Sequence, residues 1–275
     1  MLGEALSAEK ITACLQTGAL PVIVLQSVDS SNEWCRRQCR QGVKPPFVCF
    51  AGQQTRGRGR RGRHWHSPAG SNLYLSMVWH FERDLSRLGL LPLMAGLAVR
   101  DCLHQAGVGK ATLKWPNDVL VNGRKIAGVL VETVPGSGGA ANTMIIGVGL
   151  NVAMPDATVI PAARWTDLQQ VLPAEQQVSR NALAAMLLDH LMRACQRYAQ
   201  QPQACLQRLQ ELFATGQPVE VLSAQGERLH GVMLGISDSG ECRVRIGGRE
   251  RRFSSADISL RAAPTHKERA LAGHR

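Results

Sequence analysis

An arginine- and glycine-rich segment near the start of the sequence has the chemistry to bind an anion. Residues 53–65 read QQTRGRGRRGRHW, and five arginines lie between Arg56 and Arg63. A guanidinium pairs with carboxylate or phosphate through a planar set of donors, and glycine lets the backbone approach a ligand closely. This composition fits a flap over an anionic ligand and a tract that coats RNA phosphates about equally well. Its position between two predicted strands favours the ligand site.

A second segment combines a lysine, a proline and polar side chains ahead of a tight turn. Residues 114–118 read KWPND and residues 122–132 read NGRKIAGVLVE. Pro116 cannot donate to a strand ladder, so we expect the strand to break there and to turn the next two side chains outward. Lys125 leads an otherwise apolar strand. It fits a solvated strand end and equally a cation that reaches across a pocket to a developing negative charge.

A third segment, residues 147–151, reads GVGLN. It is not a dinucleotide-binding fingerprint, because the third glycine that opens a helix is missing and a strand continues instead. The two glycines predict that a ligand lies against this strand, with Asn151 as a hydrogen-bonding tip.

Strands and helices predicted around these segments form a domain of the α+β class. We expect strands at residues 21–28, 47–51, 72–80, 111–114, 118–122, 125–134 and 144–152. We expect helices at residues 33–41, 87–105 and 179–212, the last divided by Pro202, and a glycine-rich loop at 135–141. After Gly216 short strands joined by glycine turns predict a small SH3-like or OB-like barrel.

The bulk composition describes an ordinary globular chain with an unusual charge. Its 275 residues are 44% hydrophobic, but the formal net charge is +11, which favours anionic partners without choosing among them. Eight scattered cysteines without a Cys-x-x-Cys pair indicate reduced thiols rather than disulfides or a zinc site. With no signal peptide and no membrane-spanning run in the sequence, we expect a cytoplasmic protein.

In this order and spacing, the three segments resemble the biotin protein ligases. The resemblance covers about residues 29–261 and rests on GRGRRG at 57–62, KWPND at 114–118, and the segments 125–132 and 147–151. It implies a mixed sheet with flanking helices, the catalytic domain shared with class II aminoacyl-tRNA synthetases, followed by a small SH3-like β-barrel. We place the catalytic domain at residues 1–214, the barrel at 215–262 and a disordered tail at 263–275.

The resemblance also implies the reaction and the partners. Biotin and ATP form biotinyl-5'-AMP and pyrophosphate, and biotin then passes to one lysine of a biotin carboxyl carrier protein, such as the acetyl-CoA carboxylase subunit. Mg²⁺ is expected with ATP, and Asp118 is the one ligand that we can suggest. Too few residues precede the first strand for the DNA-binding domain of some family members. We therefore expect no DNA or membrane partner, and a possible homodimer.

The matched positions imply residue roles. Lys125 and Arg60 are the expected catalytic pair. The residues expected to bind biotin are Ser30, Ser31, Asn32, Gln54, Gly57, Arg58, Gly59, Arg60, Lys125 and Gly128. The residues expected to bind ATP are Arg58, Arg60, Trp65, Lys114, Asn117, Lys125 and Asn151. Arg56 departs from the family, which has a small residue there, and we expect its side chain to point to solvent.

Two alternatives remain. A lipoate ligase or octanoyl transferase shares the catalytic fold but lacks the GRGRRG segment. A nucleic-acid-binding protein would use the arginine tract and the C-terminal barrel. The barrel, however, is poor in the aromatic side chains on which bases stack, with Phe253 the one convincing candidate.

Overall fold

The computed structural model describes residues 4–18, 20–82, 88–134, 143–155, 164–176, 178–223, 226–254 and 258–262. They form two compact units. The first contains the residues up to 202 except 88–90, and the second contains 88–90 and the residues from 203 onward. The loop predicted at 135–141 and the tail predicted at 263–275 lie outside the described residues.

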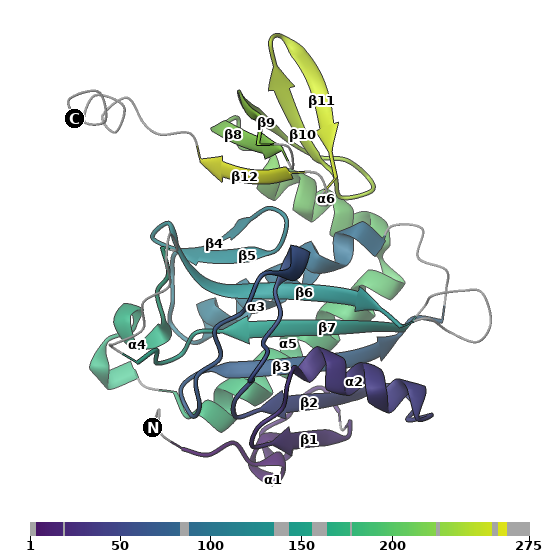
Figure 1. Ribbon diagram of the computed structural model, residues 1–275, viewed down its shortest axis with the longest axis vertical. Coiled ribbons are helices and arrows are strands. Elements are labelled where there is room, and N and C mark those ends of the chain that lie inside the picture. The colour runs from purple at the N-terminus through teal and green to yellow at the C-terminus, as the bar shows by residue number, and fades with distance from the viewer. Residues whose placement is uncertain are drawn as a thin grey trace. The chain divides into compact units, whose positions relative to one another are not determined.

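A seven-stranded mixed sheet forms the centre of the first unit (Figure 1), which confirms the predicted fold class. The strands are β1 (Val22–Leu25), β2 (Phe47–Ala51), β3 (Leu73–His80), β4 (Ala111–Lys114), β5 (Asp118–Val121), β6 (Arg124–Thr133) and β7 (Thr143–Leu150). Their order is β1-β2-β3-β7-β6-β5-β4. β1 and β2 run parallel, and the other neighbouring pairs are antiparallel.

Helices cover both faces of this sheet. They are α1 (Ala8–Ala13), α2 (Ser31–Arg40), α3 (Leu91–Gln105), α4 (Leu168–Val171) and α5 (Arg180–Gln200), with short 3-10 turns η1 (Arg60–Gly62) and η3 (Ala174–Gln176). α3 and α5 pack against each other on one face, and α2 lies on the other (Figure 1). Neighbouring residues of β7 show the two sides, because Ile146 faces α3 and α5 while Gly147 lies against α2.

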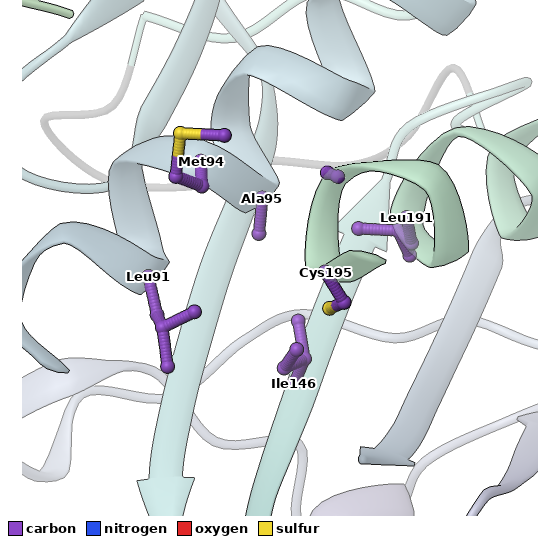
Figure 2. A pocket seen from close by; sticks show the side chains of 7 residues that line it. Leu91, Met94, Ala95, Ile146, Leu191 and Cys195 are labelled. Carbon is purple, nitrogen blue, oxygen red and sulfur yellow. The ribbon is translucent and has the colours of Figure 1, made fainter. Parts of the chain in front are cut away.

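The layer between the sheet and the α3–α5 pair is closely packed hydrophobic core. One small cavity of about 10 Å³ remains there, lined by Leu91, Met94, Ala95, Ile146, Leu191, Ala194 and Cys195 (Figure 2). Its apolar lining offers a water molecule no set of polar partners. The cavity is therefore a packing defect of the core rather than a ligand site.

The tight turn predicted between β5 and β6 is confirmed. Asn122 and Gly123 both have positive φ angles, 50° and 71°. Two consecutive positive φ angles belong to the turn whose twist matches that of antiparallel strands. Lys125 consequently lies at the second residue of β6, and its place in the sheet follows from a local signal.

Two predicted helix starts are wrong by a few residues. α2 begins at Ser31 rather than at residue 33, because Ser30 is extended, with φ −153°, and acts as the N-cap. α3 begins at Leu91 rather than at residue 87, after a separate 3-10 turn η2 (Leu88–Leu90). Pro92 then lies in the first helical turn, where its missing N–H has no partner to lose.

The second unit contains α6 (Pro202–Phe213) and a five-stranded antiparallel sheet of the SH3-like type. Its strands are β8 (Pro218–Ser223), β9 (Arg228–Ile236), β10 (Cys242–Ile246), β11 (Arg249–Phe253) and β12 (Ile258–Ala262), in the order β11-β10-β9-β8-β12. Buried side chains from these strands form its core: Val219, Val221, Met233, Ile236, Cys242, Val244 and Phe253. Within the described ranges of both units, no helix is long and apolar enough to cross a membrane.

Candidate active site

Glycines on two central strands leave room on the α2 face of the sheet. Gly128 of β6 and Gly149 of β7 are register partners, and Gly147 lies two residues before Gly149 on the same face. A Cβ atom at Gly147 would overlap the Asn32 carboxamide, and one at Gly149 would overlap the Trp65 indole. The missing side chains thus let residues from α2 and from the arginine-rich segment approach the strand backbone.

Four buried polar side chains, those of Ser31, Asn32, Gln54 and Ser76, meet at the N-terminal end of α2. Oε1 of Gln54 accepts from the Ser31 backbone N–H at 2.9 Å and from the Ser31 hydroxyl at 3.1 Å. The Ser76 hydroxyl lies 2.7 Å from Ser31 Oγ and 2.5 Å from Asn32 Oδ1. A side chain of the cluster therefore satisfies an N–H group that the first turn of a helix leaves unpaired.

The residue before the helix is held by a carboxylate. Ser30 is buried, and its N–H donates to Oδ1 of Asp29 at 2.8 Å. Both terminal nitrogens of Arg37 donate to the same carboxylate, at 2.8 and 2.9 Å. Hydrogen bonding from Arg37 lowers the pKa of Asp29 to about 2. Asp29 is thus ionised at any working pH and fixes the path of the chain into α2.

The orientation of the Asn32 carboxamide is determined by its partners. Nδ2 donates to Oε2 of Glu132 at 2.8 Å and to the Leu130 carbonyl at 3.3 Å. A carboxylate and a carbonyl can only accept, so the amide nitrogen must face them. Oδ1 of Asn32 consequently faces Ser76 and is the atom that this side chain offers to a ligand.

Gln54 presents the opposite polarity. Its Oε1 is occupied by Ser31, and its Nε2 donates to Oγ of Ser67 at 2.9 Å. Ser67 can accept this bond because its own hydroxyl donates to the Trp65 carbonyl. A carboxamide nitrogen carries two hydrogens, so Gln54 has a second donor. Together with the acceptor on Asn32, it suits a ligand group that carries both N–H and C=O.

The arginine- and glycine-rich residues 56–63, which we call the flap, fold back as a short loop. The Trp65 N–H donates to the Gly57 carbonyl at 2.9 Å, and the Gly59 N–H donates to the Arg63 carbonyl at 2.7 Å. The 3-10 turn η1 forms its tip. A Cβ atom at Gly57 would overlap the Trp65 carbonyl, so glycine is required where the loop closes.

The flap arginines differ in their surroundings. Arg58 forms ion pairs with Glu33 of α2 and with Oε1 of Glu132, the latter at 3.1 Å. Arg60 is half-buried, and its Nη1 donates to Oδ1 of Asn117 at 3.4 Å. The side chain of Arg56 is exposed, as expected. Those of Arg61 and Arg63 are exposed as well.

Lys125 lies at the other end of the site. Its Nζ is 2.5 Å from Oδ1 of Asp118 and 5.0 Å from the centre of the Trp65 ring. Its backbone N–H donates to the Arg164 carbonyl and its carbonyl accepts from the Thr166 N–H, each at 2.9 Å. The backbone is therefore held on both sides, while a third of the side chain remains open to solvent.

Trp65 joins the two ends. Its half-buried ring packs against the backbone of Gly149 and Gly128, and a Cβ atom at Gly128 would lie 3.0 Å from Cζ3 of the ring and 3.1 Å from Nζ of Lys125. Its Nε1 is buried, and no atom of the described residues accepts its hydrogen. Contacts thus connect Gln54 through Ser67 to Trp65, and Trp65 to Lys125.

The other residues expected to bind the nucleotide support the strands in this structure. Asn117 does not turn outward as predicted, because its Nδ2 donates to the Val129 carbonyl at 2.7 Å. Asn151 is buried, and its Nδ2 donates to the Thr166 carbonyl at 3.0 Å. Lys114 ends β4 as the register partner of Asp118.

The electrostatic environment around the flap suits an anion. Burial lowers the pKa of Arg60, and the charge of Arg61 lowers it further, while Asp118 acts in the opposite direction. An arginine remains charged in spite of such a shift. The half-buried cation can therefore gain from pairing with a negative ligand, as can Lys125 nearby.

Three contributors had no role assigned from sequence, namely Glu132, Ser76 and Ser67. Glu132 and Ser76 are polar residues within apolar strand runs, and this is the one signal that could have marked them. Their partners lie far away in sequence, since Asn32 is 100 residues from Glu132 and 44 from Ser76.

A metal site is not built into the described part of the chain, which contains no group of three potential ligands among His, Cys, Asp and Glu. Asp118 is paired with Lys125. Because Mg²⁺ is commonly held by substrate phosphates and waters with one or two carboxylates, the site is compatible with an ion that enters with ATP. Ligation by Asp118 stays a prediction.

Known families match both units. The profile of the biotin/lipoate A/B protein ligase family matches residues 24–151, and that of the biotin protein ligase C-terminal domain matches residues 215–261. The bifunctional ligase/repressor BirA of Escherichia coli is 35% identical over 264 residues, which are 94% of this chain and 79% of the relative. The biotin–[acetyl-CoA-carboxylase] ligase of Mycobacterium tuberculosis is 35% identical over 242 residues, 86% of this chain and 87% of the relative.

Solved structures agree with the sequence relatives. The biotin protein ligase from Aquifex aeolicus in complex with biotin and ATP is similar with a TM-score of 0.74 at 26% identity. The similarity covers 89% of this chain and all of that one, 100%.

Proposed function

This chain belongs to the biotin protein ligase family, and we propose that it activates biotin with ATP and transfers it to a biotin carboxyl carrier protein. In the first step a carboxylate oxygen of biotin attacks the α-phosphorus of ATP, and pyrophosphate leaves. The product is the mixed anhydride biotinyl-5'-AMP. In the second step the ε-amino group of a carrier lysine attacks the acyl carbon, AMP leaves, and an amide bond forms.

The paired carboxamides of Asn32 and Gln54 carry the choice of biotin as substrate. The ureido ring of biotin has N–H donors beside a carbonyl acceptor. Asn32 Oδ1 and Gln54 Nε2 offer the complementary acceptor and donor from a buried cluster. The dithiolane ring of lipoate has neither group, so it would leave these buried polar atoms without partners, which is unfavourable.

Lys125 and Arg60 are proposed as the catalytic cations. The first step brings together two anions, the carboxylate and the α-phosphate, and moves negative charge between their oxygens. A cation fixed beside both groups lowers the barrier by stabilising that charge as it develops. The position of Lys125 beside Trp65 and Asp118, on a firmly held strand start, supports this role.

The flap is proposed to keep the adenylate from water. Biotinyl-5'-AMP released into solution would hydrolyse or acylate stray amines. Arg58 and Arg60 have contacts to α2, β6 and Asn117, which support a loop that lies over the site rather than away from it. Direct contact of these arginines with the adenylate stays a prediction, as do the roles of Lys114 and Asn151.

The relatives named as ligases for acetyl-CoA carboxylase support a biotin carboxyl carrier protein as the partner. We further propose the carrier subunit of that carboxylase as the natural acceptor. Dimerisation, the absence of DNA binding and residence in the cytoplasm stay predictions.

One assay tests this function directly. We expect biotin to stimulate exchange of labelled pyrophosphate into ATP, and lipoate to leave the exchange at its background rate. Addition of a purified carrier domain should then give one biotinylated lysine per domain. Exchange that responds to lipoate and not to biotin would refute the assignment of the substrate.

A further inference from the structure

Glu132 stands at the junction between the ureido cluster and the flap. Its two carboxylate oxygens face different partners: Oε2 accepts from Asn32 Nδ2 at 2.8 Å, and Oε1 lies 3.1 Å from Nη2 of Arg58. Its side chain is 17% exposed, less than the side chains of the two arginines with which it forms ion pairs. One carboxylate therefore contacts both the head-group site and the flap.

The flap contact is part of a closed ring of four charges. Arg58 pairs with Glu33 and Glu132. Arg36 pairs with the same two carboxylates, at 3.9 Å to Glu33 and 3.0 Å to Glu132. Two positive and two negative charges alternate around this ring, which joins α2, β6 and the flap. Removing either carboxylate leaves two arginines facing one negative charge, so both removals should loosen the flap by charge repulsion.

The contact with Asn32 distinguishes the two carboxylates. Of the two carboxylates, Glu132 accepts from the Asn32 amide, whereas Glu33 pairs with the two arginines. An amide at position 132 could donate as well as accept, so the Asn32 nitrogen would be held that way only by its longer bond to the Leu130 carbonyl, at 3.3 Å. Oδ1 of Asn32 would then face the ligand N–H in only a fraction of the molecules.

We propose that Glu132 is a positioning residue that couples recognition of the ureido group to retention of the adenylate. It orients Asn32 as an acceptor and at the same time anchors Arg58 of the flap. This inference rests on the proposed function, since it names the head group of biotin as the ligand at Asn32.

Two matched variants separate the two contacts. Glu132→Gln removes one negative charge from the ring and the shorter of the two bonds that orient Asn32, whereas Glu33→Gln removes one negative charge from the same ring and leaves both bonds in place. We expect Glu132→Gln to weaken biotin binding, measured by calorimetry without ATP, by about tenfold or more, the value of a hydrogen bond to a charged group. Glu33→Gln should change it by less than about twofold. Both variants should release biotinyl-5'-AMP faster than the wild type.

A kinetic measurement excludes a merely structural effect. In Glu132→Gln, the pyrophosphate exchange rate at saturating biotin should return to within about threefold of the wild-type rate while the KM for biotin stays raised. The double variant Asn32→Asp with Glu132→Gln provides a rescue, because an aspartate offers an acceptor oxygen in either orientation. It should bind biotin more tightly than Glu132→Gln alone.

Several results would overturn the inference. Equal biotin affinity in Glu132→Gln and Glu33→Gln would remove the role at Asn32, and so would a double variant that binds no better than the single one. Unchanged adenylate release in both would remove the role at the flap. If Glu132→Gln did not fold, Glu132→Asp, which keeps the charge but draws the carboxylate back from Asn32 and Arg58, would be compared with Glu33→Gln in its place, with the same outcomes deciding both points. Absence of biotin-dependent exchange in the wild type would instead refute the proposed function itself.

Discussion

Removal of the Lys125 amine should lower the enzymatic rate far more than it lowers the free energy of unfolding. Lys125→Ala deletes the cation that we place beside the reacting carboxylate and phosphate, yet it leaves the backbone contacts of the β6 start in place. Its Nζ has two partners in the structure, Asp118 at 2.5 Å and the Trp65 ring at 5.0 Å.

The stability cost follows from these two contacts. A partly exposed ion pair contributes about 0.5–1 kcal/mol, and a cation over an aromatic ring contributes roughly 0.5–1 kcal/mol more. The free energy of unfolding should therefore fall by about 1–2 kcal/mol, which lowers Tm by roughly 2–8 °C in a domain of this size. Loss of one group that stabilises developing charge costs about 3–4 kcal/mol of the activation barrier, or roughly 10²–10³ in rate.

Lys10→Ala is the matched control. Lys10 also forms an ion pair at 2.5 Å, with Glu4, but its side chain is 61% exposed and lies outside the candidate site. Pyrophosphate exchange and thermal unfolding would be measured for wild type and both variants at saturating biotin and ATP. We expect Lys10→Ala to keep wild-type exchange and Lys125→Ala to lose at least a hundredfold. A loss below tenfold in folded Lys125→Ala would refute the catalytic role.

Three further predictions follow from the site. Arg60→Gly should speed the escape of the adenylate and increase labelling of bystander proteins, and unchanged labelling would argue against the flap as a barrier. Gly149→Ala should displace the Trp65 indole, because its new Cβ would overlap the ring; we expect a shifted tryptophan emission and a raised KM for ATP, and a wild-type spectrum would contradict the packing. Arg37 lowers the pKa of Asp29 from 3.8 to about 2, so this carboxylate stabilises the fold fully above pH about 4 and loses that effect as pH falls towards 2. Urea unfolding at several pH values should show a smaller loss of stability over this interval in Asp29→Asn, and parallel curves would contradict the ion pair.

Features that depend on neighbouring residues were predictable from the sequence. The turn at Asn122 and Gly123 requires positive φ angles that asparagine and glycine adopt at little cost, so it located Lys125 correctly at the start of a strand. The spacing of apolar residues likewise predicted the strands, the long helices and the separate C-terminal sheet. Element ends were predicted less well, since α2 and α3 begin elsewhere and β1 is shorter than the predicted run at 21–28, and the outward turn of Asn117 was predicted wrongly.

The arginine-rich flap shows where local information stops. Its residues establish an anion-binding chemistry, because arginine and glycine have these properties wherever they lie. Sequence could not decide that Arg58 would pair with Glu33 and Glu132 while Arg60 turned to Asn117. Those partners come from α2, from β6 and from the turn between β4 and β5, and only folding sets their distances.

What the sequence by itself determined, then, was the kind of chemistry, the order of the elements and the family. The tertiary structure alone decided whether Asn32 offers a donor or an acceptor to the ligand. The pairing of β6 with β7 brings Glu132 to Asn32, 100 residues away, and an acceptor-only carboxylate then turns the carboxamide oxygen towards the ligand. A carboxamide can present either a donor or an acceptor, so its role is set by the group that the folded chain places behind it.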